Sequence, residues 1–141
     1  MKKTMRCTAA ILLVLLLLSS LVACNTVEKR GVWENATYRR DTELGTGATT
    51  LVVRVEAEEQ EVTFTVKTDK DTVGAALLEH ELIAGEAGTY GLYVKVVNGM
   101  TADYDVDRSY WAFYVNEEYA MAGVDATAIE EDTVYRLVYT K

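Results

Sequence analysis

TTLVVRVEAEEQEVTFTVK, residues 49–67, is the stretch that decides the fold of this chain. Apolar residues occupy every second position in two runs, which are Leu51, Val53 and Val55, and then Val62, Phe64 and Val66. A period of two predicts strands that bury one face. Because only a short acidic connection separates the two runs, they predict an antiparallel hairpin.

The hydrophobic period changes directly after this hairpin. The spacing i, i+3, i+4 and i+7 predicts a helix of about three turns, whose apolar face carries Val73, Ala76, Leu77 and His80. Candidate N-caps stand just before it in residues 68–71, and Gly85 and Gly88 follow its expected end.

Strand patterns resume after the helix. Leu92, Val94 and Val96 share one face, and Asn98-Gly99 is the strongest short turn signal in the chain. Further strands are expected at residues 110–116 and 133–140. The order predicts an α+β, β-grasp-like domain at residues 49–141, with one helix packed on a mixed or antiparallel sheet of about five strands.

The N-terminus has the layout of a bacterial leader. Lys2, Lys3 and Arg6 precede an apolar stretch that is short for a membrane span, which needs roughly 20 residues. The ending Leu21–Cys24 is similar to a lipobox, in which a small residue precedes a cysteine that receives lipid. We therefore expect a signal peptide at residues 1–23 and lipidation of Cys24. An ordinary secretory leader is the alternative.

Removal of this leader changes the charge balance. The chain has 14 basic and 22 acidic residues, and the leader takes 3 of the basic ones, so 11 remain against 22, a net charge of −11. Such a chain repels nucleic acid and anionic headgroups, so its membrane association depends on the lipid. Cys7 leaves with the leader, so no disulfide can form within the mature chain. The expected location is the bacterial cell envelope, outside the cytoplasm.

Residues 24–48 show no sustained period, and we expect the lipidated cysteine to be followed by a tether. Trp33 and Tyr38 are exceptions that could dock a short strand onto the domain.

Catalytic and metal-binding patterns are weak. His80 is the chain's one histidine and has no candidate nucleophile beside it, so the sequence predicts no enzyme and no catalytic residue. A core position at the edge of the helix is its main interpretation, and a ligand or acid–base role is the alternative. Asp103, Asp105 and Asp107 alternate, but a calcium loop needs glycine and glutamate where Arg108 and Tyr114 stand. We expect a solvated acidic loop and no metal site, with weak Ca²⁺ binding as the alternative.

Aromatic residues are the most informative group, because tyrosine and tryptophan combine a large contact area with a polar tip. The candidate ligand-binding residues are Tyr93, Tyr110, Trp111, Tyr114 and Tyr119. For Trp111 and Phe113, which share the inward face of their strand, a core role is the preferred alternative.

The stretch YWAFYVN at residues 110–116, with Gly123-Val124-Asp125 and the acidic turn at residues 130–132, resembles the transcobalamin-like C-terminal domain family. The helix start at residues 71–78 and the strand and turn at residues 91–99 are also similar to it. The resemblance spans residues 62–141 and implies a β-grasp-like domain. In the animal carriers of vitamin B12 such a domain closes over cobalamin against a larger helical domain, and bacterial members have no assigned function.

Two functions follow as hypotheses. The first is a membrane-anchored, non-catalytic binding module for a small ligand, with cobalamin or another corrinoid as the candidate and no other cofactor. Such a module would work with a transport protein or another surface protein. The second is a protein-interaction or adhesion module at the cell surface that uses the same aromatic residues.

Overall fold

The computed structural model describes residues 31–141, so the expected signal peptide and the expected lipidation at Cys24 lie outside the described residues. Nine strands form most of the described part, and they are β1 (Thr42–Gly45), β2 (Thr49–Ala57), β3 (Gln60–Thr68), β4 (Ile83–Gly88), β5 (Gly91–Val97), β6 (Met100–Thr101), β7 (Tyr110–Val115), β8 (Glu118–Tyr119) and β9 (Val134–Thr140). The helical segments are short, and they are η2 (Val32–Asn35), α2 (Val73–Glu79), α3 (Tyr104–Asp107) and η3 (Val124–Ala126).

The strands form two sheets rather than one. Six strands pair in the order β1-β3-β2-β9-β7-β8, and three pair in the order β4-β5-β6. The larger sheet is mixed, because β3 pairs with β1, and β2 with β9, in parallel, while the other pairs are antiparallel. A mixed or antiparallel sheet was expected and the large sheet is mixed, but the estimate of about five strands was too low. Four strands were missed. β1, β6 and β8 have only four, two and two residues, too few to show a period. β4 has six, but only Ile83 in it is buried, so it shows no alternation.

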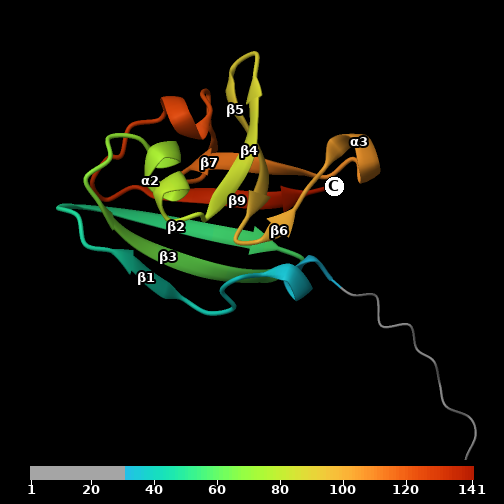
Figure 1. Cartoon of the computed structure of the whole chain (residues 1–141), viewed down its shortest axis with the longest axis horizontal. Coiled ribbons are helices and arrows are strands. Elements are labelled where there is room, and N and C mark those ends of the chain that lie inside the picture. The colour runs from blue at the N-terminus through green and yellow to red at the C-terminus, as the bar shows by residue number, and fades with distance from the viewer. Residues whose placement is uncertain (1–30) are drawn as a thin grey trace, which may run out of the picture.

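The predicted hairpin at residues 49–67 is present as β2 and β3. Val53 lies opposite Phe64 in the register, and both side chains are almost fully buried. Leu51, Val55, Val62 and Val66 are buried on the same face, and α2 and the β4–β5 hairpin lie on that side of the sheet (Figure 1). This face therefore carries the core.

Helix α2 has seven residues and is shorter than the predicted three turns. The hydroxyl oxygen of Thr72 accepts a hydrogen bond from the Ala75 amide at 3.2 Å and caps its start. His80 is the C-cap, and Glu81 then takes the left-handed conformation with a φ of 53°. That change of direction ends the helix before His80 can continue its apolar face.

The described part of the expected tether, residues 31–48, is packed on the domain. The indole N–H of Trp33 donates to the carbonyl of Ala57 at 2.7 Å. The ring of Tyr38 meets that of Phe64 edge-on at 5.7 Å, and β1 pairs with β3. Among residues 31–141, the buried hydrophobic residues from Trp33 to Leu137 form one core cluster, of the kind that a folding unit requires.

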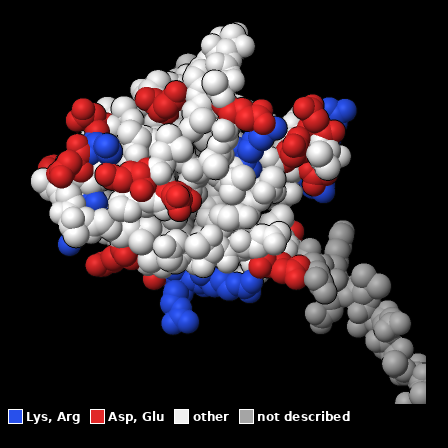
Figure 2. Space-filling model, viewed as in Figure 1, with Lys and Arg blue, Asp and Glu red and all other residues white. Residues whose placement is uncertain are grey.

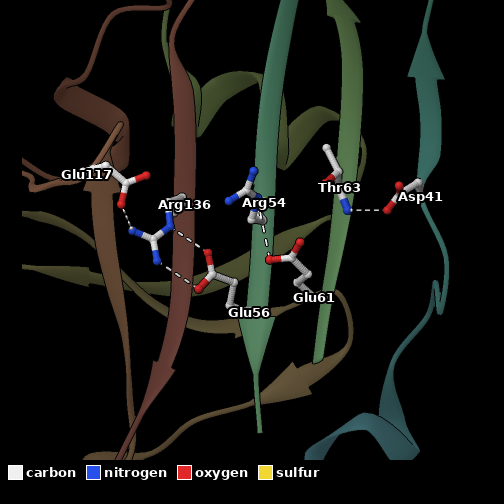
Figure 3. A network of polar contacts seen from close by, with 7 residues as sticks. All are labelled: Asp41, Arg54, Glu56, Glu61, Thr63, Glu117 and Arg136. Carbon is white, nitrogen blue, oxygen red and sulfur yellow. Dashed lines mark hydrogen bonds and ion pairs between the residues drawn. The ribbon is translucent and has the colours of Figure 1, made fainter. Parts of the chain in front are cut away.

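The opposite face of the large sheet carries polar residues that pair with one another (Figure 3). Arg136 on β9 binds both carboxylate oxygens of Glu56 on β2, at 2.6 and 2.9 Å, and contacts Glu117 at 3.2 Å. The hydrogen bonds from Arg136 hold the pKa of the Glu56 carboxyl below its usual value. These ion pairs fix the register between β2 and β9 from the side that the core does not cover.

Candidate ligand-binding groove

A groove of about 680 Å³ separates the β4–β5 hairpin from β7 and the segment that follows β8. This volume is in the usual range for small-molecule sites. The groove is lined by fifteen residues, none of them charged, which are Tyr90, Leu92, Tyr93, Val94, Tyr110, Trp111, Phe113, Tyr119, Ala120, Met121, Ala122, Gly123, Val124, Ala126 and Leu137. The site is therefore apolar and aromatic, within a chain of net charge −8.

Residues of the hairpin line one wall of the groove. The hairpin projects away from the large sheet (Figure 1). Gly91 begins β5 with a φ of +108°, a conformation that residues with a side chain rarely adopt. Tyr90 at the turn is 96% exposed and Tyr93 on β5 is 41% exposed. Figure 2 shows the projecting tip without acidic or basic side chains. The hairpin thus presents aromatic surface to solvent.

Asp125 holds this wall against the opposite one. Its carboxylate accepts a hydrogen bond from the main-chain N–H of Leu92 at 3.0 Å, across 33 residues of sequence. A β-carbon on Gly91 would lie 2.7 Å from the same carboxylate, and one on Gly74 would lie 2.8 Å from the Asp125 amide nitrogen. Val124 beside it is buried. The Gly-Val-Asp step therefore sets the width of the groove.

The floor is built from β7 and β9. Trp111 and Phe113 are 7% and 8% exposed, so the core role expected for them is present together with a place in the groove. The Phe113 ring stacks on Tyr135 at 6.2 Å, and the Trp111 ring meets Tyr139 edge-on at 5.5 Å. The indole N–H of Trp111 is buried and has no acceptor among residues 31–141.

Four of the five predicted ligand-binding residues, Tyr93, Tyr110, Trp111 and Tyr119, lie together at the groove. Tyr114 does not line it. Its ring lies under the guanidinium of Arg136 at 5.1 Å and meets Tyr119 edge-on at 5.3 Å. Since side chains alternate along β7, Tyr114 points to the polar face of the sheet while Phe113 points to the floor.

Sequence reasoning missed Tyr90 and Met121 as lining residues, and Asp125 as the residue that ties the walls. Tyr90 belongs to the aromatic cluster, so its residue type was a usable signal. Met121 is fully exposed in a segment without periodicity, and no pattern marked it.

The remaining candidate residues contact neighbouring parts of the fold. The ring of His80 lies 3.8 Å from the Glu79 carboxylate, and its Nε2 would lie 2.8 Å from a β-carbon on Gly45. Asp103 caps α3 by accepting from the Asp105 amide at 3.0 Å. Within residues 31–141, no group of three or more His, Cys, Asp or Glu residues is placed to hold a metal ion.

Asp107 is the most perturbed acid of the described chain. Hydrogen bonds from the hydroxyl of Ser109, then from Lys141 and the Ser109 amide, lower the pKa of its carboxyl to about 2. Lys141 contacts it at 2.9 Å and so ties the C-terminus to α3. These partners account for the perturbation without a ligand.

No helix within residues 31–141 is both long enough and apolar enough to span a bilayer.

Comparisons with known proteins bear on the same region. The model of a family described as "Domain of unknown function (DUF4430)" matches residues 70–140, and no curated protein sequence matches the chain. A crystal structure from Ruminococcus gnavus ATCC 29149, described as a "putative metal binding protein", is similar with 26% identity and a TM-score of 0.62 over 66% of this chain and 97% of that one. Haptocorrin in complex with Cbi has the same fold over 69% of this chain and 26% of its own, with 14% identity and a TM-score of 0.53.

Proposed function

This chain belongs to the DUF4430 family, and we propose that it is a non-catalytic binding module that holds the apolar face of a ligand in the groove beside Trp111. The observation that carries the proposal is the uncharged aromatic lining, because such a surface gains most by covering a flat, weakly polar molecule. The similarity to a structure described as metal-binding and the fold shared with haptocorrin support a binding role in general.

A corrinoid is our candidate ligand, and the arrangement of one helix against a mixed sheet is interpreted as β-grasp-like. The groove is open, since Tyr90 and Met121 at its rim are 96% and fully exposed. Tight sites usually bury 70–90% of a small ligand. We therefore expect weak binding by this domain alone and a tighter complex when a transport or surface protein covers the open side.

Equilibrium dialysis of residues 31–141 against cobalamin and related corrinoids tests the ligand. Saturable binding that is weakened about tenfold by truncation of Tyr93 is the expected result, and no binding at high micromolar ligand would refute the corrinoid version. Dialysis is preferable to fluorescence here, because corrinoids absorb light in the range where Trp33 and Trp111 emit.

The same exposed rim favours a second candidate function, a protein-interaction or adhesion module. An exposed apolar patch with a polar surround is typical of protein interfaces. Chemical crosslinking from a residue introduced at Met121, followed by identification of the captured envelope protein, distinguishes this candidate from corrinoid binding. One dominant crosslinked protein without corrinoid binding would favour it.

We also propose that the module is anchored in the bacterial envelope by lipid on Cys24. Mass spectrometry of the N-terminal peptide should find a diacylated cysteine at this position. Cys24→Ser should release the protein from the membrane fraction, and an unchanged distribution would contradict the anchor.

A further inference from the structure

Strand β5 has a free edge that faces the groove. β4 pairs with it from Gly91 to Val97, with a register shift that leaves Lys95 without a partner in β4. β6 reaches only Val96 and Val97, and the Ala102 amide adds a bond to the Lys95 carbonyl at 2.8 Å. The first half of β5, Gly91–Val94, therefore has no strand on its second side. Leu92 and Val94 within it are lining residues of the groove.

The direction of the main-chain groups on this edge follows from Leu92. Its N–H points away from β4, because it donates to the Asp125 carboxylate. Main-chain groups two residues apart in a strand point the same way, so the N–H of Val94 and the carbonyl of Leu92 also face the groove. No group of the described chain is hydrogen-bonded to the Val94 N–H at this edge. The carboxylate of Asp125 thus occupies the place that a neighbouring strand's carbonyl would take.

The far wall of the groove also carries an incomplete strand edge. β8 pairs with Tyr114 and Val115 of β7, and the Ala120 amide extends the ladder by one bond to the Phe113 carbonyl at 3.0 Å. The ladder stops there, and Trp111 lies beyond it with its indole N–H unpaired. The unpaired main-chain groups at these two strand edges favour an occupant that supplies donors and acceptors over a purely apolar one.

We propose that the occupant of the groove is an extended, uncharged peptide segment of a partner protein, which adds to β5 as a further strand. The inference rests on the second candidate function, a protein-interaction module, and names the chemistry of the partner. Unpaired main-chain donors and acceptors at strand spacing are the recognition surface for a peptide main chain.

Because the lining of the groove is uncharged, the side chains of the bound segment that enter it should also be uncharged. A charged side chain placed among the fifteen uncharged lining residues would lose its water without gaining an ion partner. Every second residue of the bound segment faces the groove and is therefore apolar. These residues rest on Trp111 and Phe113. The free stretch of β5 accommodates about four residues, or roughly 13 Å of strand.

Random short peptides displayed on phage and selected on residues 31–141 provide the probe. An enriched peptide is then synthesised in three forms: unmodified, and N-methylated on one or the other alternate set of its amides. Strand addition predicts that methylation of one set raises Kd by about tenfold or more, while the other set changes it little. Equal effects of both sets, or no enriched peptide, would overturn the inference.

Two further measurements keep the result independent of any single variant. Val94→Pro removes the edge N–H and should abolish binding, while Val94→Ala retains it and should weaken binding only moderately. Amide exchange should slow at Val94 when the peptide binds and stay unchanged at Val53 in the core, and an unaltered Val94 amide would contradict strand addition. A protein that binds corrinoids but enriches no peptide would overturn this inference and leave the proposed function standing.

Discussion

The side chain of Asn98 makes both of its hydrogen bonds with the main chain of Tyr38, 60 residues away. Its Oδ1 accepts from the Tyr38 N–H at 2.8 Å, and its Nδ2 donates to the Tyr38 carbonyl at 2.7 Å. The residue is buried and left-handed, with a φ of 51°. A turn between β5 and β6 therefore also fastens the segment that leads into β1.

Asn98→Ala should lower the free energy of unfolding by about 2–4 kcal/mol, because it leaves two buried main-chain groups of Tyr38 unpaired and strains the left-handed turn. Urea denaturation of residues 31–141 measures the change. Asn98→Gly is the matched control, since it relieves the backbone strain but not the lost bonds, and it should recover about 1 kcal/mol. Equal stability of the alanine variant and the wild type would contradict this role.

Only one of the two roles of Asn98 was predictable from the sequence. Asn98-Gly99 was predicted to be a turn from residue type alone, because a tight hairpin needs φ above zero, and the structure confirms it. The second role of Asn98 depends on a segment 60 residues away, and no local pattern contains that information. Long-range side-chain bonds of this kind are fixed only when the sheet has assembled.

Several lining residues of the groove were also predictable from the sequence, but the way its walls come together was not. Alternation along β7 identified Trp111 and Phe113 as inward residues, and residue type singled out the tyrosines around them. The packing of β7 beside a hairpin from the other sheet was not predictable, because no local pattern links β5 with β7. Tyr114 was placed in the candidate set for its residue type, although its parity along the strand separates it from Phe113.

Acid should weaken the link between Glu56 and Arg136. Arg136 holds the folded-state pKa of Glu56 below its ordinary value, so its stabilising effect is complete above the unfolded pKa, near 4.5, and is lost as pH falls through the lower folded value. Glu56→Gln should cost about 1 kcal/mol at neutral pH. This difference from wild type should shrink below about pH 4.

Thermal unfolding of both proteins across that pH range makes the comparison. Glu61→Gln is the control, since Glu61 is exposed and lies 3.8 Å from Arg54 without a close hydrogen bond. A constant difference between Glu56→Gln and wild type at all pH values would refute the linkage.

The carboxyl of Asp107 should titrate with a pKa of about 2 in a carbon-detected NMR experiment. Because the Ser109 hydroxyl is its strongest partner, Ser109→Ala should raise this pKa more than Lys141→Ala does. The Lys141 effect should also diminish in high salt, because that pair is exposed. The reverse order of the two variants would show that charge rather than hydrogen bonding sets this pKa.

Removal of the Asp125 carboxylate should loosen the wall of the groove without unfolding the core. In Asp125→Ala the Leu92 amide loses its acceptor, so its hydrogen exchange should accelerate by about tenfold or more. Exchange at Phe64 in the core should remain close to wild type. Uniform acceleration at both amides would instead indicate global destabilisation.

Tyr93 and Tyr114 provide a matched pair for the groove itself. Tyr93→Ser removes an exposed ring from the groove wall, so it should leave stability nearly unchanged and raise the Kd of any groove ligand by about tenfold, the equivalent of one aromatic contact. Tyr114→Ser removes the ring under Arg136 on the other face, so it should cost stability and leave that Kd within about twofold. Dialysis or peptide titration gives the affinities, and urea denaturation gives the stabilities. Similar losses of affinity in the two variants would place the ligand elsewhere, because Tyr93 lines the groove and Tyr114 does not.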